Sequence, residues 1–209
     1  MRQTPPGING WAHGFMTFDL PGGYRGYGHL GDTVAFHSAM ILVPELNLGI
    51  FLSTNSETGG RLERGMPNAL VRQFYAAPAN IPRPGSAALI ASADAFAGDY
   101  LSTRRAYGGL EGFVGLIMGG AEVTVTPGGR LLTTRLGDVQ AYTLAGPAEQ
   151  GRFVSTTDDG RLAFHMQDDR AVSFRTDANI ETLQRAAFHQ REGTLALMAG
   201  LTGFAAVVT

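Results

Sequence analysis

Apolar residues come in long runs in the first quarter of the chain, separated by short groups of turn-forming residues. Such runs, rich in β-branched and aliphatic side chains, are typical of strands. Proline and glycine between them are typical of hairpin turns. Because near-continuous apolar runs are typical of strands buried on both faces, we also expect helices to cover this sheet. The pattern predicts strands at residues 11–20, 27–31, 34–43 and 48–53, with turns at 21–23 and 44–47.

The next segment changes to helical periodicity. Residues 61–76 place apolar side chains four apart, at Leu62, Met66, Leu70 and Phe74, which is one stripe of a helix. Pro67 lies inside this stripe, so we expect the helix to kink or restart there. A proline-rich stretch then follows, and we place a linker and domain boundary at residues 77–92.

Beyond the linker the apolar runs become short, and glycine-rich turns punctuate them. Many short strands at about ten-residue spacing indicate a sandwich or an up-and-down barrel. Residues 177–191 are polar and compatible with a helix, and 193–209 carry no charge. The predicted strands are 98–103, 112–118, 121–126, 130–134, 139–144, 152–155, 162–167 and 172–175.

The predicted fold class is therefore α+β. We expect a partial antiparallel sheet with a covering helix, followed by a small antiparallel β-barrel and a C-terminal apolar helix. The predicted domains are the sheet with its helix at 1–76, the linker at 77–92, the barrel at 93–176, and the helix and apolar tail at 177–209. The uncharged tail falls just short of the roughly 20 residues that span a bilayer. It is compatible both with the start of a transmembrane segment and with a buried helix.

Composition removes several classes of function. The net charge of −2 argues against a nucleic-acid partner, because phosphate binding needs clustered cations. All 16 basic residues other than histidine are arginine, and there is no cysteine. Mechanisms that need a lysine amine or a cysteine thiolate cannot be completed by these residues. The polar, proline-containing residues after Met1 predict no signal peptide.

Candidate chemistry is concentrated at His29, which glycines flank at positions 28 and 31. A histidine in such a strand can offer an imidazole and a free backbone N–H to one substrate atom, because glycine lets a ligand approach closely. Taken alone, the pattern fits a structural histidine better. His37 lies in an apolar run and is expected to be a core or edge residue. No histidine has companions at metal-ligand spacing, so we expect neither a metal site nor a cofactor.

Four pieces of this region carry a family resemblance. They are Tyr-Gly-His-Leu-Gly-Asp-Thr (27–33), Phe-His-Ser (36–38), Val-Pro-Glu-Leu-Asn-Leu-Gly (43–49) and Leu-Ser-Thr-Asn (52–55). In order and turn position they resemble the C-terminal segment of serine β-lactamase-like, penicillin-binding-protein-like hydrolases. The resemblance implies that His29 supports an acyl site electrostatically and that Gly31 keeps the strand edge open. It also implies that the backbone N–H of Asp32 is one donor of an oxyanion hole. Leu30 stands where Ser or Thr is usual, which favours ester or amide substrates over carboxylate-bearing ones.

The resemblance is incomplete. The family's nucleophile is a serine three residues before a lysine, and neither this motif nor the family's Tyr-x-Asn motif is present. We therefore expect the C-terminal portion of a longer serine hydrolase that acts through an acyl-serine and is inactive alone; a degenerate homologue is the rival explanation. Residues 93–176 resemble the lipocalin-like barrel appended to some members. The region from residue 183 onward resembles the junction before their membrane helices, which would favour bacterial periplasm or cell membrane.

Two further functions stay open. The chain could be a non-catalytic lipocalin-like binding module for an apolar ligand or a protein partner. Alternatively, residues 1–76 could complete the active site of another chain. Under the hydrolase hypothesis the partner is a small ester, amide or peptide substrate in the complete protein, with membrane contact through residues 193–209. The sequence leaves the oligomeric state open.

Overall fold

The computed structural model describes residues 8–33, 35–177, 181–191 and 194. Contacts divide the chain into two compact units, and each is described by itself. The first contains the described parts of 1–84, 152–163 and 175–180, and the second contains those of 85–151, 164–174 and 181–209. The predicted apolar tail at 193–209 lies outside the described residues except for Thr194.

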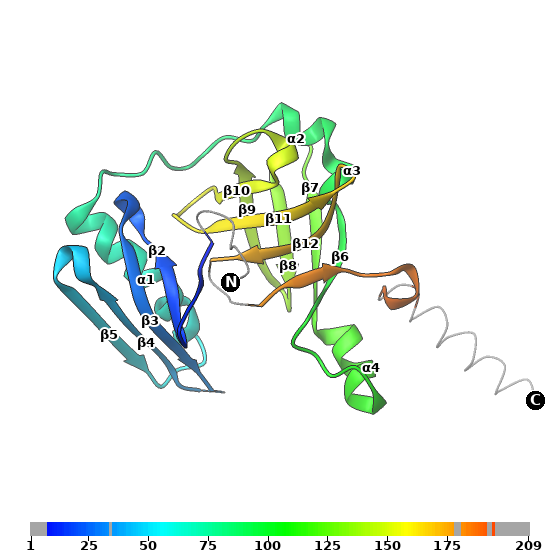
Figure 1. The fold of residues 1–209 in the computed structure, drawn as a ribbon. Coiled ribbons are helices and arrows are strands. Elements are labelled where there is room, and N and C mark those ends of the chain that lie inside the picture. Colours follow the sequence, from blue (N-terminus) through cyan, green and yellow to red (C-terminus); the bar gives the residue numbers. More distant parts are fainter. Residues whose placement is uncertain (1–7, 34, 178–180, 192–193, 195–209) are drawn as a thin grey trace, which may run out of the picture. The chain divides into compact units, whose positions relative to one another are not determined.

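The first unit contains a five-stranded antiparallel sheet in the simple order β1-β2-β3-β4-β5 (Figure 1). Short turns join its long strands, with a 3₁₀ turn at Pro44–Leu46 and Asn47 in the left-handed region. The hairpins at 21–23 and 44–47 predicted from the sequence are confirmed. The strands are β1 (Gly10–Ala12), β2 (Phe15–Asp19), β3 (Arg25–Asp32), β4 (His37–Val43) and β5 (Leu48–Thr54).

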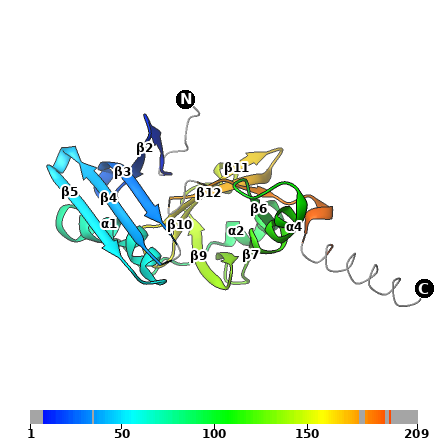
Figure 2. The ribbon, with the colours of Figure 1, turned by 90° about the horizontal axis from the view of Figure 1, so that it is seen from below.

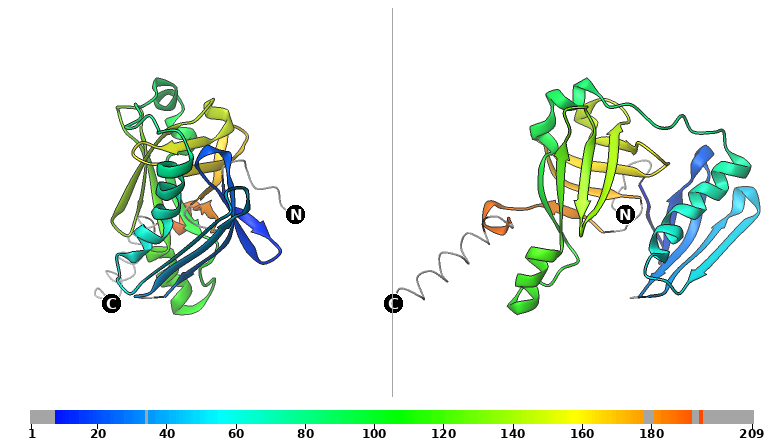
Figure 3. Two further views of the ribbon diagram at one scale, coloured as in Figure 1. Left: turned by 90° about the vertical axis from the view of Figure 1, so that its left-hand side faces the viewer. Right: turned by 180° about the vertical axis from the view of Figure 1, so that it is seen from behind.

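One helix, α1 (Gly59–Tyr75), lies along one face of this sheet (Figures 2 and 3). Side chains alternate between the two faces of a strand, so Ile41 and Val43 of β4 and Ile50 of β5 point to the helix and are buried with Val71. The opposite face presents apolar side chains that are exposed: Tyr27, Met40, Leu42 and Phe51. Burial of the strands on both faces was therefore a wrong prediction for the described residues.

Helix α1 continues through Pro67 as a single element. Pro67 is buried on the face that packs against the sheet, and packing of that face outweighs the lost backbone hydrogen bond. The predicted restart of the helix at this proline is wrong.

The second architectural element is a closed antiparallel barrel of eight strands (Figure 1). The strands follow chain order, and β13 pairs with β6 to close the ring. The predicted up-and-down barrel is confirmed at this level and is consistent with a lipocalin-like domain. The strands are β6 (Gly98–Ser102), β7 (Gly120–Val125), β8 (Leu131–Arg135), β9 (Asp138–Leu144), β10 (Arg152–Ser155), β11 (Arg161–Gln167), β12 (Arg170–Thr176) and β13 (Leu183–Arg185).

Two predictions about the barrel strands are wrong. Residues 112–118 belong to a helix, α4 (Gly109–Met118), because a short apolar run fits either element. The closing strand β13 lies within 177–191, where the polar sequence predicted a helix. Ladder pairing on both sides, with β12 and with β6, makes this short segment a strand.

Aromatic side chains fill the part of the barrel interior that belongs to the second unit. The rings of Phe96, Tyr100, Phe164 and Phe174 pack with centroids 5.0–5.8 Å apart. Arg185 of β13 lies over the Tyr100 ring at 4.9 Å and donates to three backbone carbonyls, those of Ala95, Ala97 and Ala171. This arginine therefore ties the closing strand to the start of the barrel.

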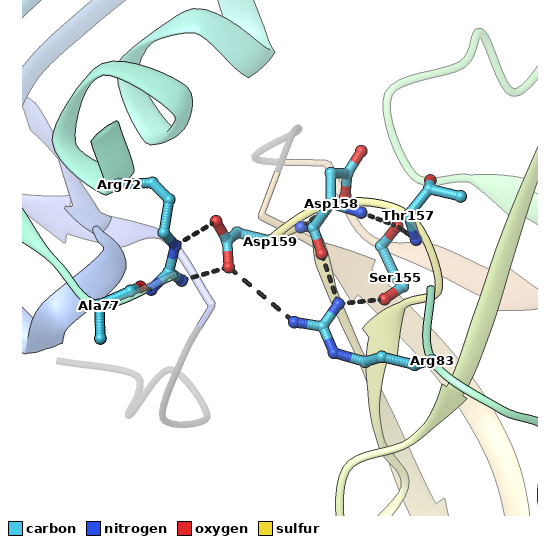
Figure 4. A network of polar contacts seen from close by, with 8 residues as sticks. Arg72, Ala77, Arg83, Ser155, Thr157, Asp158 and Asp159 are labelled. Carbon is cyan, nitrogen blue, oxygen red and sulfur yellow. Dashed lines mark hydrogen bonds and ion pairs between the residues drawn. The ribbon is translucent and has the colours of Figure 1, made fainter. Parts of the chain in front are cut away.

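The predicted linker contains one short helix, α2 (Ala87–Ala91), and a second, α3 (Ala93–Phe96), begins directly after it. Before them, within the first unit, an arginine–aspartate network fixes residues 77–84 (Figure 4). Arg72 of α1 binds both carboxylate oxygens of Asp159 and donates to Ala77 O. Arg83 donates to the carbonyls of Ser155 and Asp158, each at 2.6 Å.

Among the described helices, none has the length and apolar character needed to cross a membrane.

Candidate functional site

Strand β3 has a free edge at its C-terminal end. Its ladder with β2 runs from the pair Asp19–Arg25 to the pair Met16–Gly28, and ends there. Its ladder with β4 continues to Asp32 and His37. Residues 29–32 of β3 are therefore paired on one side only within the described sheet.

The hydrogen-bonding pattern shows which backbone groups face this edge. Thr33 N–H donates to Phe36 O across the hairpin at 2.9 Å, so the next residues toward the sheet, Asp32 and His37, form a non-hydrogen-bonded pair. Hydrogen-bonded and non-hydrogen-bonded pairs alternate along an antiparallel ladder, so Leu30 and Asp32 both belong to non-hydrogen-bonded pairs with β4. The backbone N–H and C=O groups of these two residues therefore point away from β4. The amide of Asp32 therefore faces the free edge, and its role as an oxyanion donor stays a prediction.

His29 stands beside this edge on the exposed face of the sheet. Its ring Nδ1 lies 2.5 Å from the carbonyl oxygen of Leu30, so the edge orients the imidazole. The ring of Trp11 packs against it, with centroids 5.9 Å apart. His29 and Asp32 come from the same strand, but their side chains lie on opposite faces because their positions differ by three.

Gly31 and Gly28 hold the strand close to its neighbour. A Cβ at Gly28 would lie 1.8 Å from the backbone oxygen of Met40, and one at Gly31 would lie 2.7 Å from Ser38 Oγ. The predicted role of Gly31, to keep the edge open, stays a prediction. The structure shows that a side chain there would collide with Ser38.

A second cluster lies on the helix-covered face, at the same end of the sheet. Asp32 ends β3, His37 begins β4, and Glu63 projects from α1. Asp32 Oδ1 lies 2.5 Å from His37 Nδ1, and Glu63 Oε2 lies 3.8 Å from the same nitrogen. Arg64 approaches the outer oxygen of Asp32, with Nη2 3.5 Å from Oδ2. The three side chains offer ligand atoms within 4.8 Å of one another.

The carboxyl groups of this cluster have displaced pKa values. Burial raises the pKa of Glu63 to about 7, and the negative charge of Asp32 adds to the rise. Partial burial also raises the pKa of Asp32, but the hydrogen bond with His37 and the charge of Arg64 outweigh it and lower the pKa overall. The Glu63 side chain is 0% exposed, whereas that of Asp32 is 43% exposed.

Sequence reasoning found the edge but missed this cluster. His37 was interpreted as a core or edge histidine, and Glu63 was not singled out. Positions 32 and 37 flank a hairpin loop. The contact between Asp32 and His37 could therefore have been predicted from the ends of the two strands. The approach of Glu63 depends on how α1 packs on the sheet, and the sequence pattern does not specify that rotation.

Comparisons with known proteins add little. No family model matches the chain, and no curated protein matches it. Two solved structures of SurE align with 20% identity; one of them, with D-Leu, covers 89% of this chain and 42% of that chain at a TM-score of 0.44. The other covers 88% and 40% at 0.43. An octameric penicillin-binding protein homologue from Pyrococcus abyssi aligns at 18% identity, covering 87% and 39%, with a TM-score of 0.30.

These values do not support a family assignment, and the chain spans about two-fifths of the length of those structures. The predicted membership of the serine β-lactamase-like family is wrong. The described residues form a five-stranded sheet and a closed eight-stranded barrel, which is not a β-lactamase-like fold. The penicillin-binding-protein homologue aligns only weakly.

Proposed function

We propose that the free edge of β3, with His29 beside it, is one wall of a site that hydrolyses an ester or amide, and that the nucleophile comes from residues outside this sequence. The observation that supports this most is the pair of backbone N–H groups, at Leu30 and Asp32, directed to an edge where the β2 ladder has ended. Amide donors held at a strand edge can stabilise the oxyanion of a tetrahedral intermediate, and losing one such donor typically costs about 10²–10³ in rate.

In this proposal His29 supplies the imidazole. It is exposed beside the edge and oriented by Leu30 O and Trp11, so its free ring nitrogen can reach a substrate or a nucleophile placed above the exposed face. Leu30 adds an apolar side chain rather than a hydroxyl, which favours neutral esters or amides.

The test uses the purified chain with a chromogenic ester and a fluorophosphonate probe. We expect no turnover above background and no labelled serine. Stoichiometric labelling of a serine in this chain would overturn the statement that the nucleophile lies elsewhere. The second part of the test uses the longer protein that is encoded if the reading frame extends before residue 1. There His29→Gln should lower kcat by roughly 10²–10⁴-fold, and Glu57→Gln, in an exposed loop, should leave it unchanged.

A second candidate function is ligand binding by the barrel. Aromatic side chains pack its centre, but a cavity at its rim could hold a ligand. A cavity of about 460 Å³ beside α4 is lined by Arg104, Arg105 and Arg135 together with the exposed Leu110. Arg105 Nε is buried there and has no hydrogen-bond partner in the described structure. This combination suits an apolar ligand with an anionic group. Dodecanoate should bind, and Arg105→Met should weaken its binding about tenfold; equal binding would exclude this site.

A further inference from the structure

We propose that Asp32, His37 and Glu63 bind a divalent first-row metal ion, for which Zn²⁺ is the probe. These residues come from β3, β4 and α1, so the ion would join the end of the sheet to the helix. The site is separate from the edge that carries the proposed hydrolytic function. It uses the carboxylate of Asp32 on the helix-covered face, whereas the edge uses the amide.

The ligand types are those that Zn²⁺ takes in proteins, at about 2.0–2.2 Å from nitrogen and oxygen. For tetrahedral coordination this requires ligand atoms roughly 3.4 Å apart. Glu63 Oε2 and His37 Nδ1 are already 3.8 Å apart. Asp32 Oδ1 is closer, at 2.5 Å from Nδ1, and must withdraw by about an ångström to admit an ion. Its partly exposed side chain can make this movement.

The second observation is a group of buried polar atoms that have no partners. Both carboxylate oxygens of Glu63 are inaccessible to solvent and accept no hydrogen bond from any described donor; without an ion, Glu63 gains a partner only when it is protonated and shares that proton with Asp32. Thr54 Oγ1 and His37 Nε2 are in the same condition, and Thr54 pairs with His37 across β4 and β5. A buried carboxylate without a donor is costly, and a bound cation removes that cost. Glu63 points into the cluster, so a cation there would meet it.

Charge and space also fit. Two carboxylates and a neutral imidazole balance a divalent ion. Arg64 contacts only the outer oxygen of Asp32, which leaves Oδ1 directed inward. The backbone of Gly59 and Gly60 packs on the His37 ring: a Cβ at Gly60 would lie 3.3 Å from Nδ1. Three protein ligands leave a fourth position, on the side where Asp32 is exposed.

The test is a titration of the metal-stripped chain with Zn²⁺, followed by calorimetry and by the change in Tm. We expect one tightly bound ion and a higher Tm. Glu63→Gln and Asp32→Asn should each weaken binding by roughly 100-fold or more, beyond the 10–100-fold typical of supporting residues. Glu57→Gln makes the same charge change in the exposed loop before α1 and should bind as the parent does.

Co²⁺ supplies a readout independent of stability. A four-coordinate site predicts visible absorption bands in the parent protein that are lost in Glu63→Gln. If Glu63→Gln does not fold, Asp32→Asn carries the test, because its side chain is partly exposed. Absence of Zn²⁺ binding overturns the proposal and leaves Glu63 and Asp32 sharing a proton. Equal binding by Glu63→Gln also overturns it, because Glu63 would then not be a ligand of the ion. Neither result bears on the hydrolysis assay.

Discussion

Two glycines in α1 differ in the space around them, and this difference decides what a methyl group would do. A Cβ at Gly59 would lie 1.9 Å from Thr54 Oγ1 and 3.1 Å from His37 Cδ2, whereas one at Gly65 meets nothing within 4 Å. Gly59→Ala should therefore lower the free energy of unfolding by roughly 1–3 kcal/mol through overpacking. Gly65→Ala should raise it by roughly 0.5–1 kcal/mol through helix propensity. Urea unfolding of both variants checks this, and equal effects would contradict the packing of α1 against β4 and β5.

Asp177 predicts how stability changes with pH. Burial raises the pKa of its carboxyl group from an ordinary 3.8 to about 7, while its N–H donates to Arg161 O at 3.0 Å. Between these values the native state holds a proton that the unfolded chain releases. The protonated carboxyl group therefore contributes to the free energy of unfolding, fully below about pH 4, and this contribution is lost as pH rises through 7. The free energy of unfolding falls over this range by at most about 1.4 kcal/mol per pH unit.

Asp177→Asn should remove this part of the pH dependence of the free energy of unfolding, which urea unfolding at pH 5, 6, 7 and 8 measures. Asp168→Asn, which changes an exposed turn residue, is the matched control and should retain it. An unchanged slope in Asp177→Asn would show that the carboxyl group is not the source.

At the scale of elements, the register of β4 and β5 assigns neighbouring residues to opposite faces. Ile50 is 5% exposed beneath α1, and Phe51 is 74% exposed on the other face. Ile50→Ala should cost roughly 2–5 kcal/mol because it leaves a cavity, and Phe51→Ala should change stability by roughly 0.5 kcal/mol or less. A larger loss at Phe51 would mean that something covers that face.

The network of Figure 4 predicts coupling between the C-terminal end of α1 and the turn before β11. Arg72 and Asp159 form a bidentate, largely buried ion pair, which is stronger than an exposed one. A double-mutant cycle with Arg72→Met and Asp159→Asn should give a coupling energy of roughly 0.5–3 kcal/mol. Additive single effects would show that the pair contributes nothing of its own.

Most elements were predictable because their signals are local. Apolar runs, Pro21 and the turn at Pro44 predicted the four long strands, and a four-residue spacing predicted α1. Residues 112–118 and the strand β13 were not predictable. Both are short: an apolar run such as 112–118 fits a helix or a strand, and pairing with β12 and β6 decides the conformation of β13. Burial of β4 and β5 was overestimated because an apolar run does not reveal whether a second layer exists.

At the scale of the whole molecule, the candidate chemistry lies at one end of the five-stranded sheet. The sequence singled out His29 by its flanking glycines, and the family resemblance added Gly31 and the Asp32 amide; the roles of all three stay predictions. It did not identify the cluster with Glu63, which depends on contacts between β3, β4 and α1. The family inferred from those same residues was wrong. A short strand motif like that at 27–33 can therefore occur in a chain that does not have the fold of the family it resembles. The proposed hydrolytic role rests on the edge of β3 alone.

The edge is tested most directly by the amide resonances of β3. In a ¹⁵N-labelled chain titrated with methylphosphonate, an anion that resembles a tetrahedral intermediate, we predict saturable shifts at Leu30 and Asp32. The amide of Tyr27, which points toward β4, should stay in place. Shifts confined to residues away from β3, or equal shifts along the whole strand, would contradict an oxyanion-binding edge.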